Sequence, residues 1–147
     1  MTRSHWTITT DLTGRRRDVD VFLYDKLSHL RAAATRHSKA WEPDFEPLVY
    51  ATAVCHGFRG FRINPDGSEE ERTDAAILRF ARGHVTPVIV AHEVVHAAQH
   101  LYGLDCLTTD SAKDHFTVDN ERFAYLVGDL FNTVFNLFHE PIEANDG

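Results

Sequence analysis

The sequence lacks the features that mark secreted, membrane-spanning and nucleic-acid-binding proteins. It has two cysteines, Cys55 and Cys106, far apart and outside any C-x-x-C pattern, so buried free thiols are expected rather than a disulfide framework. No apolar run approaches the roughly 18 residues of a membrane span, and no hydrophobic signal region opens the chain. We therefore expect a cytoplasmic protein with no membrane partner.

Basic residues are also scarce. Fifteen Lys and Arg stand against 22 Asp and Glu, giving a net charge of −7, which argues against a nucleic-acid partner. The composition, 43% hydrophobic and 25% charged with ten Phe, is that of a globular protein. We expect one domain over residues 1–147, with flexible ends at 1–5 and 140–147.

The motif with the clearest chemistry is His92-Glu93-Val94-Val95-His96. Residues four apart lie on one face of an α-helix, so His92 and His96 can direct two imidazoles at one Zn²⁺ ion. Glu93 is close enough to hydrogen-bond a metal-bound water, the arrangement of a metallohydrolase. Although the chain contains ten His, its composition predicts only about 0.04 chance matches to this motif.

The motif falls within a predicted helix. Thr86 suits the N-cap, Pro87 the first helical position, and Gly103 a left-handed residue after the last turn. The intervening residues are apolar nearly all round, so the helix should be buried. Buried imidazoles and a carboxylate need partners, and a metal supplies them.

Other segments predict a small sheet and two further helices. Asp25 can cap a helix that runs to Trp41, and a last helix spans Asn120 to about His139. Asn64–Gly67 is a strong turn signal. We expect an edge strand at 5–10, a strand at 19–24, a central strand at 48–55, a strand at 61–63, and one at 75–82 that returns antiparallel. Both Arg15–Arg17 and Glu69–Glu71 read as solvated loops.

These elements predict an α+β, minimal zincin-like fold. A mixed or antiparallel sheet of three or four strands would pack on the motif helix and on a C-terminal helix that carries a third ligand. The strand at 75–82, just before the motif helix, could lie at the sheet edge with free backbone groups above the metal. An extended peptide could bind there as an added strand. The alternative is an internal, fully paired strand.

Catalytic zinc usually has three protein ligands and leaves a fourth position to water. His100 continues the face of the motif, but three stacked imidazoles cannot converge on one ion, since His92 and His100 are about 12 Å apart along the axis. His115 and Asp114 are possible third ligands. Glu121 is the best placed, because it precedes small residues that allow its helix to approach another closely.

The segments Ala91–Ala98 and Asn120–Gly128 together carry a family resemblance. They resemble the small zinc metallopeptidases encoded by tailed phages, mostly of actinobacteria. They are similar, more distantly, to gluzincins, in which H-E-x-x-H is followed by Asn-Glu on a second helix, and to ImmA/IrrE-type peptidases. The resemblance covers roughly residues 86–138. It implies metal ligands at His92, His96 and Glu121, with Glu93 as the base.

The expected activity is zinc-dependent hydrolysis of a peptide or protein substrate, in which Glu93 assists attack by zinc-bound water and later protonates the leaving amine. A second electrophile is needed for the oxyanion, and Tyr125 and His115 are the main candidates. Tyr125 stands where thermolysin-like enzymes place an aspartate that orients a histidine, so Asp105 or Asp129 is considered for that role.

A non-cleaving alternative belongs to another functional class. A zincin scaffold of phage origin could keep zinc for stability alone and bind or regulate a host factor. A fourth coordination position closed by His100, His115 or Cys106 would favour this alternative, whereas an open position would favour the enzyme.

Overall fold

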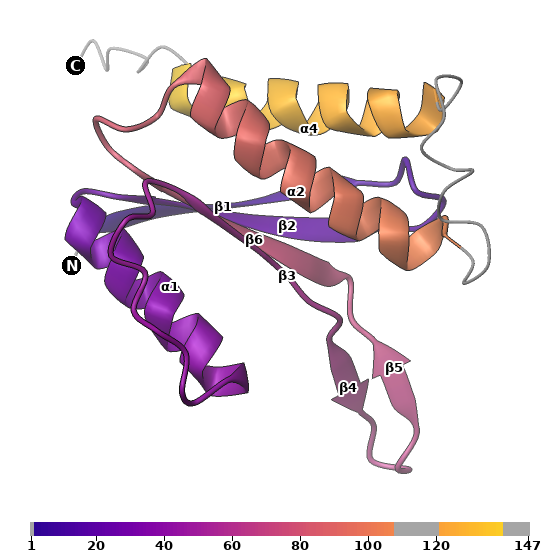
Figure 1. The fold of residues 1–147 in the computed structure, drawn as a ribbon. Coiled ribbons are helices and arrows are strands. Elements are labelled where there is room, and N and C mark those ends of the chain that lie inside the picture. Colours follow the sequence, from indigo (N-terminus) through magenta and orange to yellow (C-terminus); the bar gives the residue numbers. More distant parts are fainter. Residues whose placement is uncertain (1, 108–120, 140–147) are drawn as a thin grey trace, which may run out of the picture.

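The computed structural model describes residues 2–107 and 121–139, apart from the side chain of Glu121. Figure 1 shows the arrangement of the elements. In chain order they are β1 (Arg3–Thr10), β2 (Arg17–Tyr24), α1 (Leu27–Trp41), β3 (Val54–Gly57), β4 (Phe61–Ile63), β5 (Glu69–Glu71), β6 (Asp74–Ala81), α2 (Pro87–Asp105) and α4 (Glu121–His139).

Four of the strands form one mixed sheet in the order β1-β2-β6-β3. β1 and β2 are antiparallel, β2 and β6 are parallel, and β6 and β3 are antiparallel. β4 and β5 form a separate hairpin that projects away from the sheet (Figure 1). The α+β class with a small mixed sheet is thus confirmed. Within the two described ranges, no helix combines the length and apolarity needed to cross a lipid bilayer.

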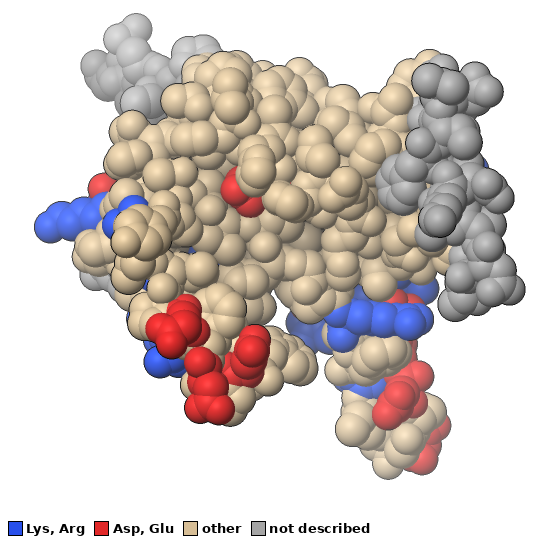
Figure 2. All heavy atoms as spheres, viewed as in Figure 1, with Lys and Arg blue, Asp and Glu red and all other residues tan. Residues whose placement is uncertain are grey.

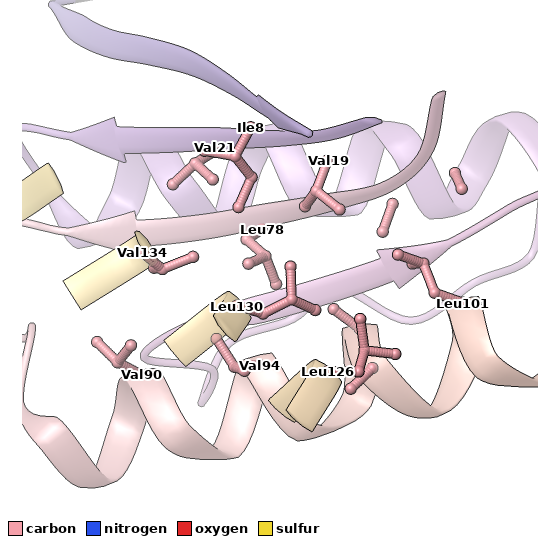
Figure 3. Packing of buried hydrophobic residues seen from close by; sticks show 14 of the residues in the cluster. Ile8, Val19, Val21, Leu78, Val90, Val94, Leu101, Leu126, Leu130 and Val134 are labelled. Atoms are coloured by element: carbon pink, nitrogen blue, oxygen red, sulfur yellow. The ribbon is translucent and has the colours of Figure 1, made fainter. Parts of the chain in front are cut away.

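Helices cover both faces of the sheet. Alternate residues of β2 and β6 point to one face, where α2 and α4 pack over them, and α1 packs on the other face (Figure 1). Figure 3 shows how side chains from the strands and from both helices meet. Core members that are at most 1% exposed include Val19, Val21, Leu78, Phe80, Val90, Val94, Ala97, Leu101, Leu126 and Val134.

The sheet edge near α2 differs from the expectation. The strand at 75–82 exists as β6, but it is internal, with β2 and β3 on its two sides. The expected central strand at 48–55 is wrong, since only Val54–Gly57 form a strand, and that strand is the edge. The segment before it lies against α1 instead, where Thr35 Oγ1 accepts from the Leu48 N–H (3.2 Å) and Arg31 Nε donates to the Ala51 carbonyl (2.9 Å).

The start of α2 agrees with the sequence, and its end does not. Thr86 is the N-cap, and its Oγ1 accepts from the Ile89 N–H at 3.3 Å. The helix continues through Gly103 to Asp105, so the predicted left-handed stop at Gly103 is wrong. At the C-terminal end of the chain, α4 matches the expected last helix to within one residue, while residues 140–147 lie outside the described ranges.

Two smaller expectations near the N-terminus also fail. Residues 3–5, expected to be flexible, belong to β1, which confirms the predicted edge strand at 5–10 and extends it. Asp25 does not cap α1. The N-cap is Lys26, which makes no side-chain capping bond, and Asp25 Oδ1 accepts from Arg82 Nε at 2.9 Å.

A buried ionic cluster fixes the C-terminal end of α2 to the sheet. Arg17 is 1% exposed and donates to both carboxylate oxygens of Asp105, at 2.9 and 2.6 Å. It also donates to Glu71 at 3.1 Å, and Thr13 Oγ1 donates to Asp105 at 2.6 Å. Arg17 and Glu71 are therefore structural. The predicted loop at Glu69–Glu71 is wrong, because these residues form β5, and Arg17 is a buried strand residue and not part of a solvated loop.

The cluster predicts acid sensitivity. Hydrogen bonds from Arg59 and then Arg17 outweigh desolvation and lower the pKa of Glu71 from 4.5 to about 2. A carboxyl group with a depressed pKa in the folded state stabilises fully above its ordinary pKa. This contribution is lost as the pH falls from about 4.5 to about 2.

We expect Glu71→Gln to lower the free energy of unfolding at pH 7 by about 1–2 kcal/mol, because buried Arg17 loses a charged acceptor. The variant should also lose part of the pH dependence between about 4.5 and 2. The measurement is urea denaturation across this pH range. Glu70→Gln is the matched control, since the Glu70–Arg62 pair is exposed and should change stability by less than about 0.5 kcal/mol. Equal effects of the two substitutions would contradict the structural role of Glu71.

Candidate metal centre

The helical spacing of the motif brings the two imidazoles together. The Nε2 atoms of His92 and His96 are 3.2 Å apart, and the two rings are almost perpendicular, at 77°. Two nitrogens bound to zinc at 2.0–2.1 Å with tetrahedral angles lie about 3.3 Å apart. The positions of both nitrogens therefore fit two ligands of one tetrahedral zinc ion.

The pair faces a hollow between α2 and the edge strand. This hollow has a volume of about 470 Å³ and is lined by His92, Glu93, His96 and His100 from α2, and by Cys55 and Gly57 from β3. The side chain of His92 is 66% exposed, so the imidazole can be reached from solvent. The hollow leaves room beside the two nitrogens for water and for part of a substrate.

Glu93 lies on the inner side of the pair. Its residue is 7% exposed, and Oε1 is 4.0 Å from His92 Nε2. Desolvation raises the pKa of the Glu93 carboxyl above its ordinary value, against the opposing influence of His92, His96 and the Cys55 N–H. A carboxylate beside the ligand pair and shielded from bulk water is suitably placed to accept and return a proton.

The backbone of the edge strand β3 meets the Glu93 carboxylate at Cys55. In the β3–β6 ladder the Cys55 N–H points away from β6, on the free side of β3, where it lies close to the Glu93 carboxylate and lowers its pKa. Burial, with the charge of Glu93, raises the pKa of the Cys55 thiol to about 12. The thiol is therefore protonated at neutral pH, and the part of Cys55 that serves the site is its amide. A backbone donor of this kind leaves no signal in the residue type.

His100 is fastened to the same strand. Its Nε2–H donates to the Phe58 carbonyl at 2.9 Å. A Cβ atom at Gly57 would lie only 2.4 Å from His100 Cγ, so the imidazole packs against bare backbone. A side chain at position 57 would prevent this close approach. His100 is thus held away from the fourth coordination position.

The proposed third ligand is at the start of α4. Glu121 is the first residue of that helix, and its side chain is outside the described part of the structure. Phe123 meets Tyr102 edge to face at 5.6 Å, which puts the start of α4 beside the C-terminal part of α2. Among the described side chains, no group of three or more His, Cys, Asp or Glu could hold a metal ion. The described side chains therefore supply the pair His92 and His96 but no third ligand beside it.

The other candidate residues are distributed as follows. His115 and Asp114 lie outside the described ranges. Tyr125 is 68% exposed on α4 and is not among the residues that line the hollow. Cys106, considered for the fourth position, has its Sγ 3.7 Å from the Thr13 carbonyl oxygen.

The candidates for orienting the imidazoles lie elsewhere. Asp105 is bound to Arg17 and Thr13, so an orienting role for Asp105 was wrong. Asp129 borders a different hollow, next to residues 9–12. Within the described ranges, neither His92 nor His96 has a hydrogen-bond partner at Nδ1.

The contact between His100 and Gly57 is testable. We expect Gly57→Ala to displace the imidazole, break the bond to Phe58 and lower the free energy of unfolding by about 1–3 kcal/mol. Gly60→Ala is the control, because its Cβ would meet only the flexible Arg72 side chain at 3.4 Å. Thermal denaturation compares the two variants, and equal stability would show that the close approach has no consequence.

Comparison with known proteins gives no further assignment: no protein-family model, curated protein or solved structure matches this chain.

Proposed function

We propose that the protein is a zinc-dependent metallopeptidase. His92 and His96 would hold the metal, with Glu121 of α4 as the third ligand. The observation that carries the proposal is the 3.2 Å separation of the two Nε2 atoms at the wall of a hollow, beside a buried carboxylate. His100 and Cys106 make their contacts elsewhere, which supports a fourth position open to water rather than a closed structural site.

Glu93 would act as the acid–base catalyst. A bound zinc ion supplies Lewis acidity, which makes water acidic enough to lose a proton near neutral pH and polarises a carbonyl group. Glu93 takes that proton and later delivers it to the leaving amine. The Cys55 N–H beside the carboxylate favours its charged form and so would help Glu93 act as the base.

The free edge of β3 would bind the substrate. The Cys55 carbonyl and the backbone of Gly57 face away from β6, beside the Cys55 N–H that meets Glu93, and an extended peptide can pair with such an edge. This placement brings the peptide backbone into the hollow that His92 and His96 border. The sequence left open whether the strand at residues 75–82 is an edge or internal; it is internal, and the proposed peptide-binding edge is at residues 54–57.

His115 and Tyr125 are proposed for the oxyanion. Tyr125 would have to turn inward from its exposed position on α4 to reach the hollow. For the setting, we propose a peptide or protein substrate in the cytoplasm of a bacterial or phage-infected cell. The net charge of −7 makes nucleic acid an unfavourable partner.

The ligand set predicts the metal content. The purified protein should contain one zinc ion per chain, and His92→Ala, His96→Ala and Glu121→Ala should each weaken zinc binding by at least about 100-fold. Elemental analysis and competition with a chelator measure this. His5→Gln serves as the control, since His5 of β1 pairs with Asp20 of β2, outside the hollow. Unchanged zinc affinity in Glu121→Ala would remove that residue from the ligand set.

The role of Glu93 predicts a separation of metal binding from catalysis. We expect Glu93→Gln to keep zinc and to lower peptide hydrolysis by about 10²–10⁴-fold, because the amide cannot take a proton. Incubation with a complex peptide mixture, followed by mass spectrometry, measures cleavage across many sequences at once. Loss of zinc together with activity would give Glu93 a structural role, and zinc without cleavage in the unaltered protein would favour the non-cleaving binding protein.

A further inference from the structure

A second hollow lies on the opposite face of β3. It has a volume of about 430 Å³ and is bounded by the end of α1, the segment that follows α1, and β3. Gly57 lines both this hollow and the one that holds His92 and His96. The four-residue edge strand thus separates the candidate metal centre from a second cavity, which we call the α1 pocket.

Aromatic rings form the walls of the α1 pocket. Trp41, Phe45 and Phe58 line it together with His37 and His56. Trp41 is 77% exposed at the end of α1, although an indole ring is usually covered. Exposed Trp beside a cavity is typical of binding surfaces, because the ring offers a large rigid contact area.

The two histidines of the pocket are neutral at ordinary pH. Arg79 can only donate, so His56 Nδ1 must accept from Arg79 Nη1 at 2.9 Å, and His56 Nε2–H then faces Ser38 Oγ at 3.1 Å. Burial, followed by His37 and Arg79, lowers the pKa of His56 to about 4. Burial and Arg79 also lower the pKa of His37, whose ring lies 4.3 Å from that of His56.

Glu42 carries the unpaired charge in the lining of the α1 pocket, because the nearby Arg79 is 7% exposed, is bound to His56 Nδ1 and does not line the pocket. Glu42 is the carboxylate in its lining and forms no ion pair with any described cation, including Lys39 one turn earlier. The only fixed cation among the described lining residues is Arg59. Its guanidinium is bound to Glu71 at 3.0 and 3.3 Å and lies over the Phe61 ring. Figure 2 shows acidic side chains gathered over the end of α1 and the segment after it.

We propose that the α1 pocket binds a cationic side chain, arginine or lysine, of the peptide that lies along β3. A cation is attracted to the faces of aromatic rings, most strongly to Trp, and Glu42 supplies the opposite charge. The neutral His37 ring has a nitrogen free to accept from a guanidinium or ammonium group. An uncharged aromatic side chain would fill the volume but would leave Glu42 unpaired.

The alternation of side chains links this pocket to the metal centre. In a strand added to β3, every second side chain faces α2 and the others face α1. One bound peptide can therefore place a basic side chain in the α1 pocket while its backbone passes His92 and His96. This inference rests on the proposed function, because that proposal puts a peptide on this edge.

Binding can be measured without catalysis. Trp6→Phe leaves Trp41 as the only indole, since the chain has two Trp, and Trp6 is packed in the core against Phe138. Peptides that differ at one position, with Arg, Lys, Leu, Phe or Glu, are titrated while Trp41 fluorescence is followed, in zinc-loaded Glu93→Gln protein and in metal-free protein. We expect Arg and Lys peptides to bind at least about tenfold more tightly than the others.

Two variants test the named contacts. Glu42→Gln and Trp41→Leu should each remove the preference for Arg and Lys; with Trp41→Leu, calorimetry replaces fluorescence. Glu69→Gln, an exposed acidic residue on the β4–β5 hairpin, is the control and should keep the preference. Equal binding of Arg and Leu peptides, a preference for Phe, no binding of any peptide, or an unchanged preference in Glu42→Gln would overturn the proposal.

The design separates the two proposals. A preference for Arg and Lys in a protein that holds no zinc and cleaves nothing would support the α1 pocket and refute the peptidase. Zinc-dependent cleavage that is indifferent to basic residues, with no such preference in binding, would refute the α1 pocket and leave the peptidase standing.

Discussion

The close approach of the Cys55 N–H to the Glu93 carboxylate, which lowers the pKa of that carboxyl against burial, brings the motif helix against the free edge of the sheet. Successive residues of an α-helix are rotated by about 100°. A rotation of α2 by one residue would remove Glu93 from β3 and turn both imidazoles away from the hollow. The bond from His100 to Phe58, about 10 Å further along the helix axis, attaches α2 to the same chain segment a second time. The Cys55–Glu93 contact and the His100–Phe58 hydrogen bond together oppose both rotation and sliding of α2.

Burial of the Glu93 carboxylate against β3 lowers the stability of the fold. A carboxylate at 7% exposure loses hydration, and the raised pKa of Glu93 expresses that loss. One amide donor and two nearby imidazoles offset only part of it. An apolar residue at this position would suit the surrounding core better, because Val90, Val94 and Ala97 are fully buried on the adjoining face. A buried acid that weakens its own helix packing is typical of a residue kept for chemistry.

The parts of the fold that depend on local sequence were predictable. The cap at Thr86, the spacing of His92 and His96, and the turn at Asn64–Gly67 are each set by residues within a few positions of one another. The sheet order was not predictable in this way. Leu48–Cys55 has the composition of a central strand, yet its backbone forms hydrogen bonds with side chains of α1. No local sequence pattern encodes such a contact between distant elements.

In the candidate site, too, the features set by local sequence were predictable and those set by distant residues were not. The ligand pair follows from helical periodicity, but the amide of Cys55 and the bare backbone of Gly57 act through main-chain atoms from 38 and 43 residues away from their partners. The ionic cluster was missed for a related reason. Arg17 lies 88 residues before Asp105 and 54 before Glu71, and in the sequence it is one of three adjacent arginines. Nothing local distinguishes the buried one from its two exposed neighbours.

The edge strand gives the two hollows a fixed relation. Cys55 and His56 point to opposite faces of β3, the first toward α2 and the second toward α1. A peptide paired with this edge has the same alternation, and a shift of its register by one residue exchanges every side chain between the faces. A basic side chain held in the α1 pocket therefore fixes the register of the whole peptide. With the register fixed, the proposed peptidase would present the same peptide bond to His92 and His96, so a pocket on one face of the strand would select the bond cleaved on the other.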